Sequence, residues 1–305
     1  MQPVQRILVV ITREAPTQPA LERALAFAKD TSVTITLLSS VYQPALELTA
    51  VIAPDERQAM RLQYLKARQE YLEQLTRDFP HANVEYNCRT VWNKKPSTAI
   101  LDYLEDHEFD LTIKRISRDA SSENPFVMPT DWQLLRFCPT PLLLVKDEQW
   151  HTDRPLLAAV SLTQVDSKHQ ALNQQIIHAA QQLSRQLDCD FHLVSTHATP
   201  NLDVPLDYKP LSDKPLRERV NAFHQERMRK LIDEYPLRAE QLHIVEGLAE
   251  EQIPLTAQQI GAQLVIMGTV ARTGLTAAFM GNTAERVLAQ LQCEVLALKP
   301  QGFEV

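Results

Sequence analysis

Short apolar runs alternate along this chain with segments that carry apolar residues at helical spacing. The runs at 6–12 (RILVVIT) and 142–145 (LLLV) are uninterrupted, as is typical of parallel strands buried on both faces. One helical segment has apolar residues at i, i+3, i+4 and i+7, namely Leu21, Ala24, Leu25 and Ala28. This alternation of strand and helix patterns predicts an α/β fold with parallel sheets.

The same order of elements is expected twice. In the first half the pattern predicts strands at 6–12, 33–38, 83–91, 111–113 and 142–145, and helices at 18–29, 55–78, 96–105 and 130–137. In the second half it predicts strands at 156–160, 191–196, 242–246, 264–267 and 295–298, and helices at 171–187, 216–235, 255–260 and from 282 onward.

Two pairs of segments show this internal repeat most clearly. The matches are 110–114 (DLTIK) with 263–267 (QLVIM), and 128–133 (MPTDWQ) with 280–285 (MGNTAE). A polar segment at 146–155 separates the halves. We therefore predict two tandem α/β domains, 1–147 and 154–305, with right-handed crossovers between parallel strands.

Composition limits the classes of function. With 305 residues, 44% hydrophobic and 23% charged, the chain has the make-up of two ordinary globular domains. Its net charge of −7 argues against a nucleic-acid partner, because contacts to phosphates need a basic face. No apolar run approaches the ~20 residues of a membrane span, and the first strand follows Met1 closely. We expect a cytoplasmic protein without a signal peptide or a membrane partner.

Residue types that often carry metal or catalytic chemistry are present, but their spacing does not form a known site. The four cysteines include no CxxC pair and the nine histidines no HExxH motif, so we expect no metal site and histidines at the surface. Ser161 follows a strand, but no GxSxG elbow surrounds it. These absences favour a non-catalytic protein.

Glycine is confined to the last fifth of the chain. Three of the six glycines, Gly268, Gly274 and Gly281, follow the apolar run 264–267, and Asn282 then begins a helical segment. A strand, a glycine-containing loop and a helix N-terminus direct backbone N–H groups and the helix dipole toward an anion, usually a phosphate.

A domain of about 150 residues that ends in a G-x-x-G-x9-G-[S/T] loop, a capped helix and a strand resembles the universal stress protein family. The strings GTVARTG at 268–274 and MGNTAE at 280–285 carry the resemblance, which covers both halves of the chain. It implies that each domain is a doubly wound, five-stranded parallel sheet with helices on both faces. It also implies that the halves pair as an intramolecular pseudo-dimer, and it leaves a further homodimer open.

The resemblance implies a candidate site for ATP or AMP in the C-terminal half. The positions that it points to are Gly268, Thr269, Ala271, Arg272, Gly281, Asn282 and Thr283, with Ser161 and Thr196 at the ends of neighbouring strands. Two of these depart from the family pattern: Ala271 replaces the second glycine, and Asn282 replaces Ser or Thr. Thr12 and Ser161 stand where the family often has an Asp near the adenine.

The N-terminal half lacks the glycine motif. Arg115 and Pro129 stand where the first and third glycines are expected, and Pro129 has no N–H to donate. We therefore expect that this half does not bind ATP in the family manner.

Two classes of function follow from these observations. The first is a non-catalytic stress-response scaffold that senses a nucleotide or another small molecule in its C-terminal half. The second is a weak ATPase, but the loop 269–280 contains no Asp or Glu that could hold a metal. A third alternative is a binder of another small molecule, either phosphorylated or apolar, and the apolar residues at 275–280 would suit the latter.

Overall fold

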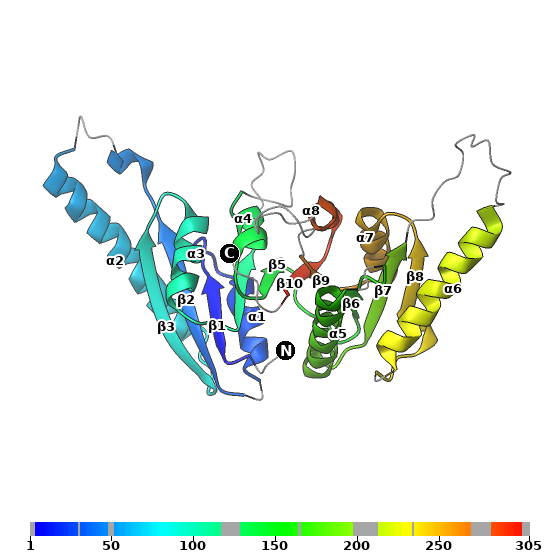
Figure 1. The fold of residues 1–305 in the computed structure, drawn as a ribbon. Coiled ribbons are helices and arrows are strands. Elements are labelled where there is room, and N and C mark those ends of the chain that lie inside the picture. Colours follow the sequence, from blue (N-terminus) through cyan, green and yellow to red (C-terminus); the bar gives the residue numbers. More distant parts are fainter. Residues whose placement is uncertain are drawn as a thin grey trace, which may run out of the picture. The chain divides into compact units, whose positions relative to one another are not determined.

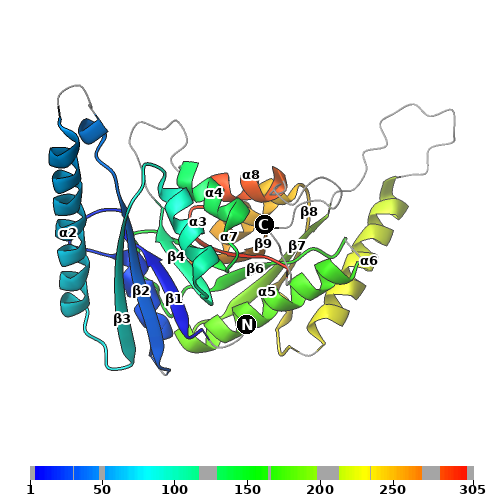
Figure 2. The same ribbon diagram turned by 60° about the vertical axis from the view of Figure 1, so that its left-hand side comes forward.

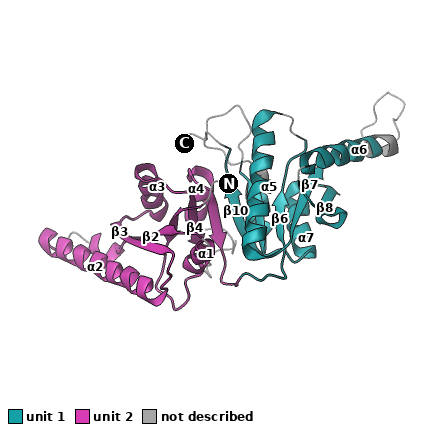
Figure 3. Ribbon diagram, turned by 90° about the horizontal axis from the view of Figure 1, so that it is seen from below, with its two compact units in different colours: residues 1, 150–303 teal, residues 2–149, 304–305 magenta. Residues whose placement is uncertain are grey.

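The computed structural model describes residues 4–29, 31–47, 52–116, 129–163, 166–197, 213–233, 235–269 and 282–300. Within these ranges the chain forms two compact units, residues 2–149 and residues 150–303 (Figure 3). We call them the N-terminal domain and the C-terminal domain.

The N-terminal domain is built on a parallel sheet. Its strands are β1 (Arg6–Val10), β2 (Val33–Val41), β3 (Val84–Trp92), β4 (Leu111–Arg115) and β5 (Leu142–Val145). Its helices are α1 (Pro19–Phe27), the 3-10 helix η1 (Pro44–Glu47), α2 (Pro54–Asp78), α3 (Pro96–Asp106) and α4 (Pro129–Phe137). The strand order is β3-β2-β1-β4-β5, and each neighbouring pair is parallel.

The C-terminal domain repeats this topology. Its strands are β6 (Leu156–Ala159), β7 (Phe191–His197), β8 (Leu242–Glu246), β9 (Leu264–Gly268) and β10 (Glu294–Leu298). Its helices are α5 (Ser167–Leu187), α6 (Asp213–Ile232), the 3-10 helix η2 (Ala239–Gln241), α7 (Ala249–Gln259) and α8 (Asn282–Gln290). The strand order β8-β7-β6-β9-β10 is again parallel throughout.

Both faces of each sheet are covered by helices (Figures 1 and 2). In the N-terminal domain α1 and α2 pack on one face and α3 and α4 on the other, as right-handed crossovers in this strand order require. Ile7 and Leu8 point to opposite faces of the sheet, and both are 0% exposed. The uninterrupted apolar runs of the sequence therefore correspond to strands buried on both sides, as predicted.

Three helices begin three or more residues earlier than the apolar pattern predicts, and one of them is α6, which begins at Asp213 instead of residue 216. Helix α5 begins at Ser167 instead of residue 171, because Asp166 caps it by accepting hydrogen bonds from the backbone N–H groups of Lys168 and His169, both at 3.1 Å. Helix α7 begins at Ala249 instead of residue 255, so Pro254 lies inside this helix and not before it.

Membrane-spanning helices and metal-binding clusters are both absent from the described ranges. None of the helices there has the length and apolar character that crossing a membrane requires. The same ranges hold no group of three or more His, Cys, Asp or Glu side chains that could bind a metal ion.

Candidate functional site

The carboxyl ends of β6 and β9 define the candidate site of the C-terminal domain. Chain connections leave these two adjacent strands in opposite directions, and open α/β sheets bind ligands at such a switch point. Gly268 is the last residue of β9, and Ser161 lies two residues beyond the end of β6. The topology thus brings together two of the residues that the sequence singles out.

Ser161 is fixed through its backbone by a residue that the sequence analysis missed. The Ser161 N–H donates to Asn173 Oδ1 at 3.0 Å, and Asn173 Nδ2 donates to the Ser161 carbonyl at 2.7 Å. Asn173 is 6% exposed on α5, whereas Ser161 is exposed. This arrangement holds the loop after β6 and leaves the Ser161 hydroxyl on the surface. A polar residue on the buried face of the predicted helix at 171–187 was the signal available in the sequence.

Gly268 has a packing role that needs no ligand. A Cβ atom at this position would lie 2.4 Å from Leu172 Cδ2 and 3.1 Å from Leu172 Cγ. Any side chain here would therefore force Leu172 of α5 to move. The glycine at the end of β9 permits close packing between this strand and α5, so its presence alone does not indicate a phosphate site.

Thr269 and Thr196 contribute to the site in different ways. The Thr269 N–H donates to the Leu298 carbonyl at 3.0 Å, and its hydroxyl, which is buried, lies 3.4 Å from the same oxygen. The hydroxyl is thus engaged with β10. Thr196 is half-buried near the end of β7, where it pairs in register with Val245.

The remaining predicted site residues belong to the loop before α8 and to the start of that helix. Ala271, Arg272 and Gly281 lie outside the described residues. Asn282 and Thr283 are the first two residues of α8, as the sequence predicts for a helix that begins here, and their side chains are outside the described part.

The other helix that begins near the switch point, α5, already has a negative group at its N-terminus. Asp166 accepts two backbone hydrogen bonds there, and its second oxygen lies 2.6 Å from His169 Nδ1. The backbone hydrogen bond from His169 is the largest cause that lowers the pKa of Asp166. A carboxylate therefore occupies the position where an external anion could bind to α5.

The N-terminal domain holds a buried ion pair between the end of β4 and the start of α4, the elements equivalent to β9 and α8. Lys114 is the fourth residue of β4 and pairs in register with Val10 of β1, as Met267 of β9 pairs with Ala159 of β6. Lys114 Nζ lies 2.6 Å from Asp131 Oδ1 in the first turn of α4, and the two side chains are 2% and 1% exposed. Lys114 also donates to the Arg115 carbonyl at 2.9 Å. Asp131 thus places a carboxylate at the start of the helix equivalent to α8.

Arg115 is also engaged within the N-terminal domain. It occupies the position of the first family glycine, and its guanidinium forms an ion pair with Asp147. Its side chain is only 14% exposed.

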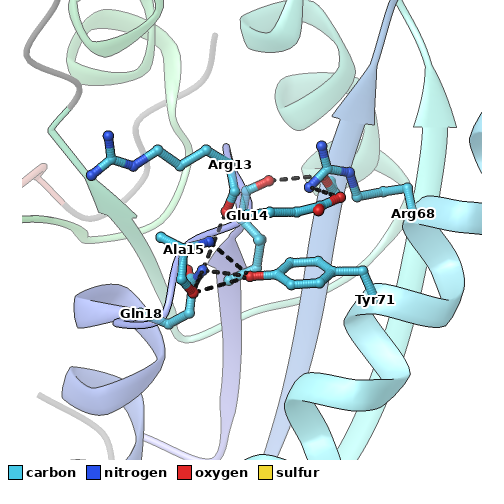
Figure 4. Close-up of polar contacts among 8 residues, drawn as sticks. Arg13, Glu14, Ala15, Gln18, Arg68 and Tyr71 are labelled. Atoms are coloured by element: carbon cyan, nitrogen blue, oxygen red, sulfur yellow. Dashed lines mark hydrogen bonds and ion pairs between the residues drawn. The ribbon is translucent and has the colours of Figure 1, made fainter.

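Side chains from α2 fix the loop after β1 (Figure 4). The hydroxyl of Tyr71 accepts hydrogen bonds from Gln18 Nε2 at 2.8 Å and from the Ala15 N–H at 3.2 Å. Arg68 forms an ion pair with Glu14 at 3.5 Å. These contacts hold the loop between β1 and α1 against α2.

The expectation of surface histidines is wrong for two residues. His197 on β7 and His224 on α6 are 5% and 4% exposed and stack on each other. His192, on the opposite face of β7, contacts His243 of β8 through ring nitrogens 2.9 Å apart. Sequence spacing alone could not show these pairs, because tertiary packing sets the position of α6 on the sheet, and the pairing of β7 with β8 sets which residue lies beside His192.

Comparison with known proteins agrees with this architecture. A model of the universal stress protein family matches residues 3–146 and 162–299, and the chain belongs to that family. Universal stress protein E of Escherichia coli K12 is 31% identical over 301 residues, which cover 98% of this chain and 95% of that protein. A homologue in Haemophilus influenzae is 32% identical, with 97% of both chains covered.

Solved structures support the same assignment. A universal stress protein from Pseudomonas aeruginosa UCBPP-PA14 superposes with a TM-score of 0.77 at 30% identity, covering 99% of this chain and 95% of the other. A universal stress protein from Archaeoglobus fulgidus, at 15% identity and a TM-score of 0.61, shares the fold over 96% of this chain and 98% of its own. The tandem doubly wound fold is thus confirmed.

Proposed function

We propose that this chain is a non-catalytic stress-response protein whose C-terminal domain senses a nucleotide, ATP or AMP. The ligand would lie at the carboxyl ends of β6 and β9, with its phosphates at the N-terminus of α8. The N-terminal domain would serve as a scaffold that binds no nucleotide.

The charge at two equivalent helix N-termini is the observation that carries the proposal. Helix α4 begins Pro-Thr-Asp, and Asp131 brings its own carboxylate to the first turn. Helix α8 begins Asn-Thr-Ala, so Thr283 stands at the position equivalent to Asp131, and the first acidic residue of α8 is its fourth, Glu285. Since a helix N-terminus favours a negative group, α8 is suited to an external phosphate where α4 already has an internal anion.

The same comparison argues against a nucleotide in the N-terminal domain. The Lys114–Asp131 pair occupies the buried space between β4 and α4, and Arg115 is paired with Asp147. Pro129, at the start of α4, has no N–H to offer to a phosphate. A bound nucleotide there would have to displace a buried ion pair.

The absence of acidic residues from the loop 269–280 supports a binding role over catalysis. Hydrolysis of ATP usually depends on a metal ion held near the phosphates by oxygen ligands, and this loop supplies no carboxylate. The pairing of the domains as an internal pseudo-dimer stays a prediction from the family resemblance.

Isothermal titration calorimetry of the full chain with ATP and with AMP tests the proposal. The wild-type chain should bind one nucleotide, and Gly281→Asp should weaken binding at least about tenfold, since it adds bulk and negative charge beside the phosphates. Pro129→Asp, which places the same Asp at the equivalent position of the N-terminal domain, is the matched control and should bind as the wild type does.

Equal binding by the wild type and Gly281→Asp would contradict the location of the site. Loss of binding in Pro129→Asp alone would place the nucleotide in the N-terminal domain instead. Release of phosphate from ATP by the wild type, abolished in Gly281→Asp, would favour the ATPase alternative over a sensor.

A further inference from the structure

A pair of buried histidines connects α6 to the carboxyl end of β7. The rings of His197 on β7 and His224 on α6 stack with centroids 4.7 Å apart and an interplanar angle of 23°. Among the described side chains of α6, which begin at residue 218, His224 and Met228 are the two that are buried. Phe223 is 46% exposed. The histidine pair is therefore a main part of the contact that holds α6 on the sheet.

Hydrogen bonding shows which protonation state this contact suits. His197 Nε2 lies 3.1 Å from Asn221 Oδ1, so Nε2 donates and the neutral ring carries its lone pair on Nδ1. Within the described part of the chain, the Nδ1 atoms of His197 and His224 have no hydrogen-bond partner. A proton added to either Nδ1 would be buried without an acceptor, which is unfavourable.

The charged groups around the histidine pair do not favour a positive charge on His224. Burial lowers the pKa of His224, and the neighbouring His197 and Arg227 lower it further. On β8, Glu246 pairs in register with His197, and its side chain is exposed. The other charged residues on the described part of α6 are exposed as well: Glu218, Arg219, Glu226, Arg229 and Lys230.

We propose that the stacked His197 and His224 form an acid-sensitive latch, which holds α6 on the sheet while the His224 ring is neutral and releases it when that ring is protonated. A histidine that is neutral in the docked state and free to charge in the released state weakens docking as the pH falls below its ordinary pKa of 6.5. Above that pH the contact is fully formed. Below it, the titration of His224 shifts the docking equilibrium by up to about tenfold per pH unit.

Release of α6 would also change the loop after β6. Arg227 Nη1 donates to the Leu162 carbonyl at 2.8 Å, so α6 holds the residue next to Ser161. An undocked α6 loses this hydrogen bond. The latch does not depend on the proposed nucleotide, because each group in it belongs to the chain itself.

Hydrogen exchange of the full chain, followed by mass spectrometry at pH 7.5, 6.5 and 5.5 and corrected for intrinsic rates, tests the latch. Between pH 6.5 and 5.5 the protection of peptides from α6 should fall about fivefold, while that of α5 changes little. His224→Phe keeps a ring that can stack but cannot be protonated, and its α6 should lose much less protection over the same range.

Two further variants complete the test. His243→Gln removes the other histidine pair of this sheet and should keep the pH response of α6. If His224→Phe does not dock at pH 7.5, His224→Gln serves as the non-titrating variant. A loss of protection equal in the wild type and the non-titrating variant, or no loss in the wild type, would overturn the proposal.

Discussion

The buried ion pair between Lys114 and Asp131 offers a direct test of the difference between the domains. Lys114→Met and Asp131→Thr each introduce the residue found at the equivalent C-terminal position, 267 or 283, and leave one charge without its partner. The two charged atoms are 2.6 Å apart, and both side chains are at most 2% exposed. Removing one partner of a pair buried to this degree costs about 3–5 kcal/mol of unfolding free energy.

The double variant Lys114→Met/Asp131→Thr should recover most of this loss. It removes both charges together, and the neutral residues have similar volumes. Replacement of a buried ion pair by neutral residues is often without net effect, so we expect the double variant within about 1 kcal/mol of the wild type. The two single losses should therefore be strongly non-additive.

Urea unfolding followed by circular dichroism, together with calorimetric melting, measures these changes. For a domain of this size, a loss of 3–5 kcal/mol lowers the melting temperature by about 10 °C. Lys66→Met on α2 is the control, because Lys66 forms a 3.8 Å pair with Glu70 in which both side chains are exposed, and it should leave the midpoint unchanged. Single variants that unfold within about 1 kcal/mol of the wild type would refute the reasoning.

Three further predictions concern the C-terminal domain. Gly268→Ala should lower the free energy of unfolding by about 1–3 kcal/mol, because the new Cβ would lie 2.4 Å from Leu172 Cδ2. In denaturation experiments this loss should not add to the loss caused by Leu172→Ala, and full additivity would exclude the contact. Because the pKa of Asp166 is lowered in the folded state, its cap stabilises the protein above its ordinary value of 3.8, and this contribution is lost as the pH falls below that value. Asp166→Asn should reduce the dependence of the melting temperature on pH in this acidic range. An unchanged dependence would argue against the cap. Burial raises the pKa of Cys189 to about 11, so iodoacetamide at pH 8 should label it much more slowly in the native protein than in urea, and equal rates would contradict the burial.

The sequence was sufficient to predict the fold because the strands are marked by strong apolar runs. Runs such as 6–12 and 264–267 coincide with strands β1 and β9, since helices on both faces of a parallel sheet require apolar residues at successive positions. The internal repeat then gave the order of elements in the second domain from the first. Helix starts were less accurate, because polar first turns such as that of α5 lie outside the apolar pattern.

The candidate site was predicted only in outline. Its place at the end of β9 follows from the topology, but Asn173 and Leu172 act on Ser161 and Gly268 from α5, and no local pattern shows which residues of a helix reach a given strand end. Lys114 is a further example. A lysine at the end of an apolar run is usually exposed, and only the position of Asp131 on α4 makes its burial possible.

Hydrogen exchange of the full chain with and without ATP tests the central claim most directly, since it locates a ligand without any substitution. The account predicts that ATP protects peptides from the ends of β6 and β9 and from the start of α8, and leaves those from β1, β4 and α4 unchanged. Protection of the β4 and α4 peptides instead, or no change in either domain at saturating ATP, would contradict it.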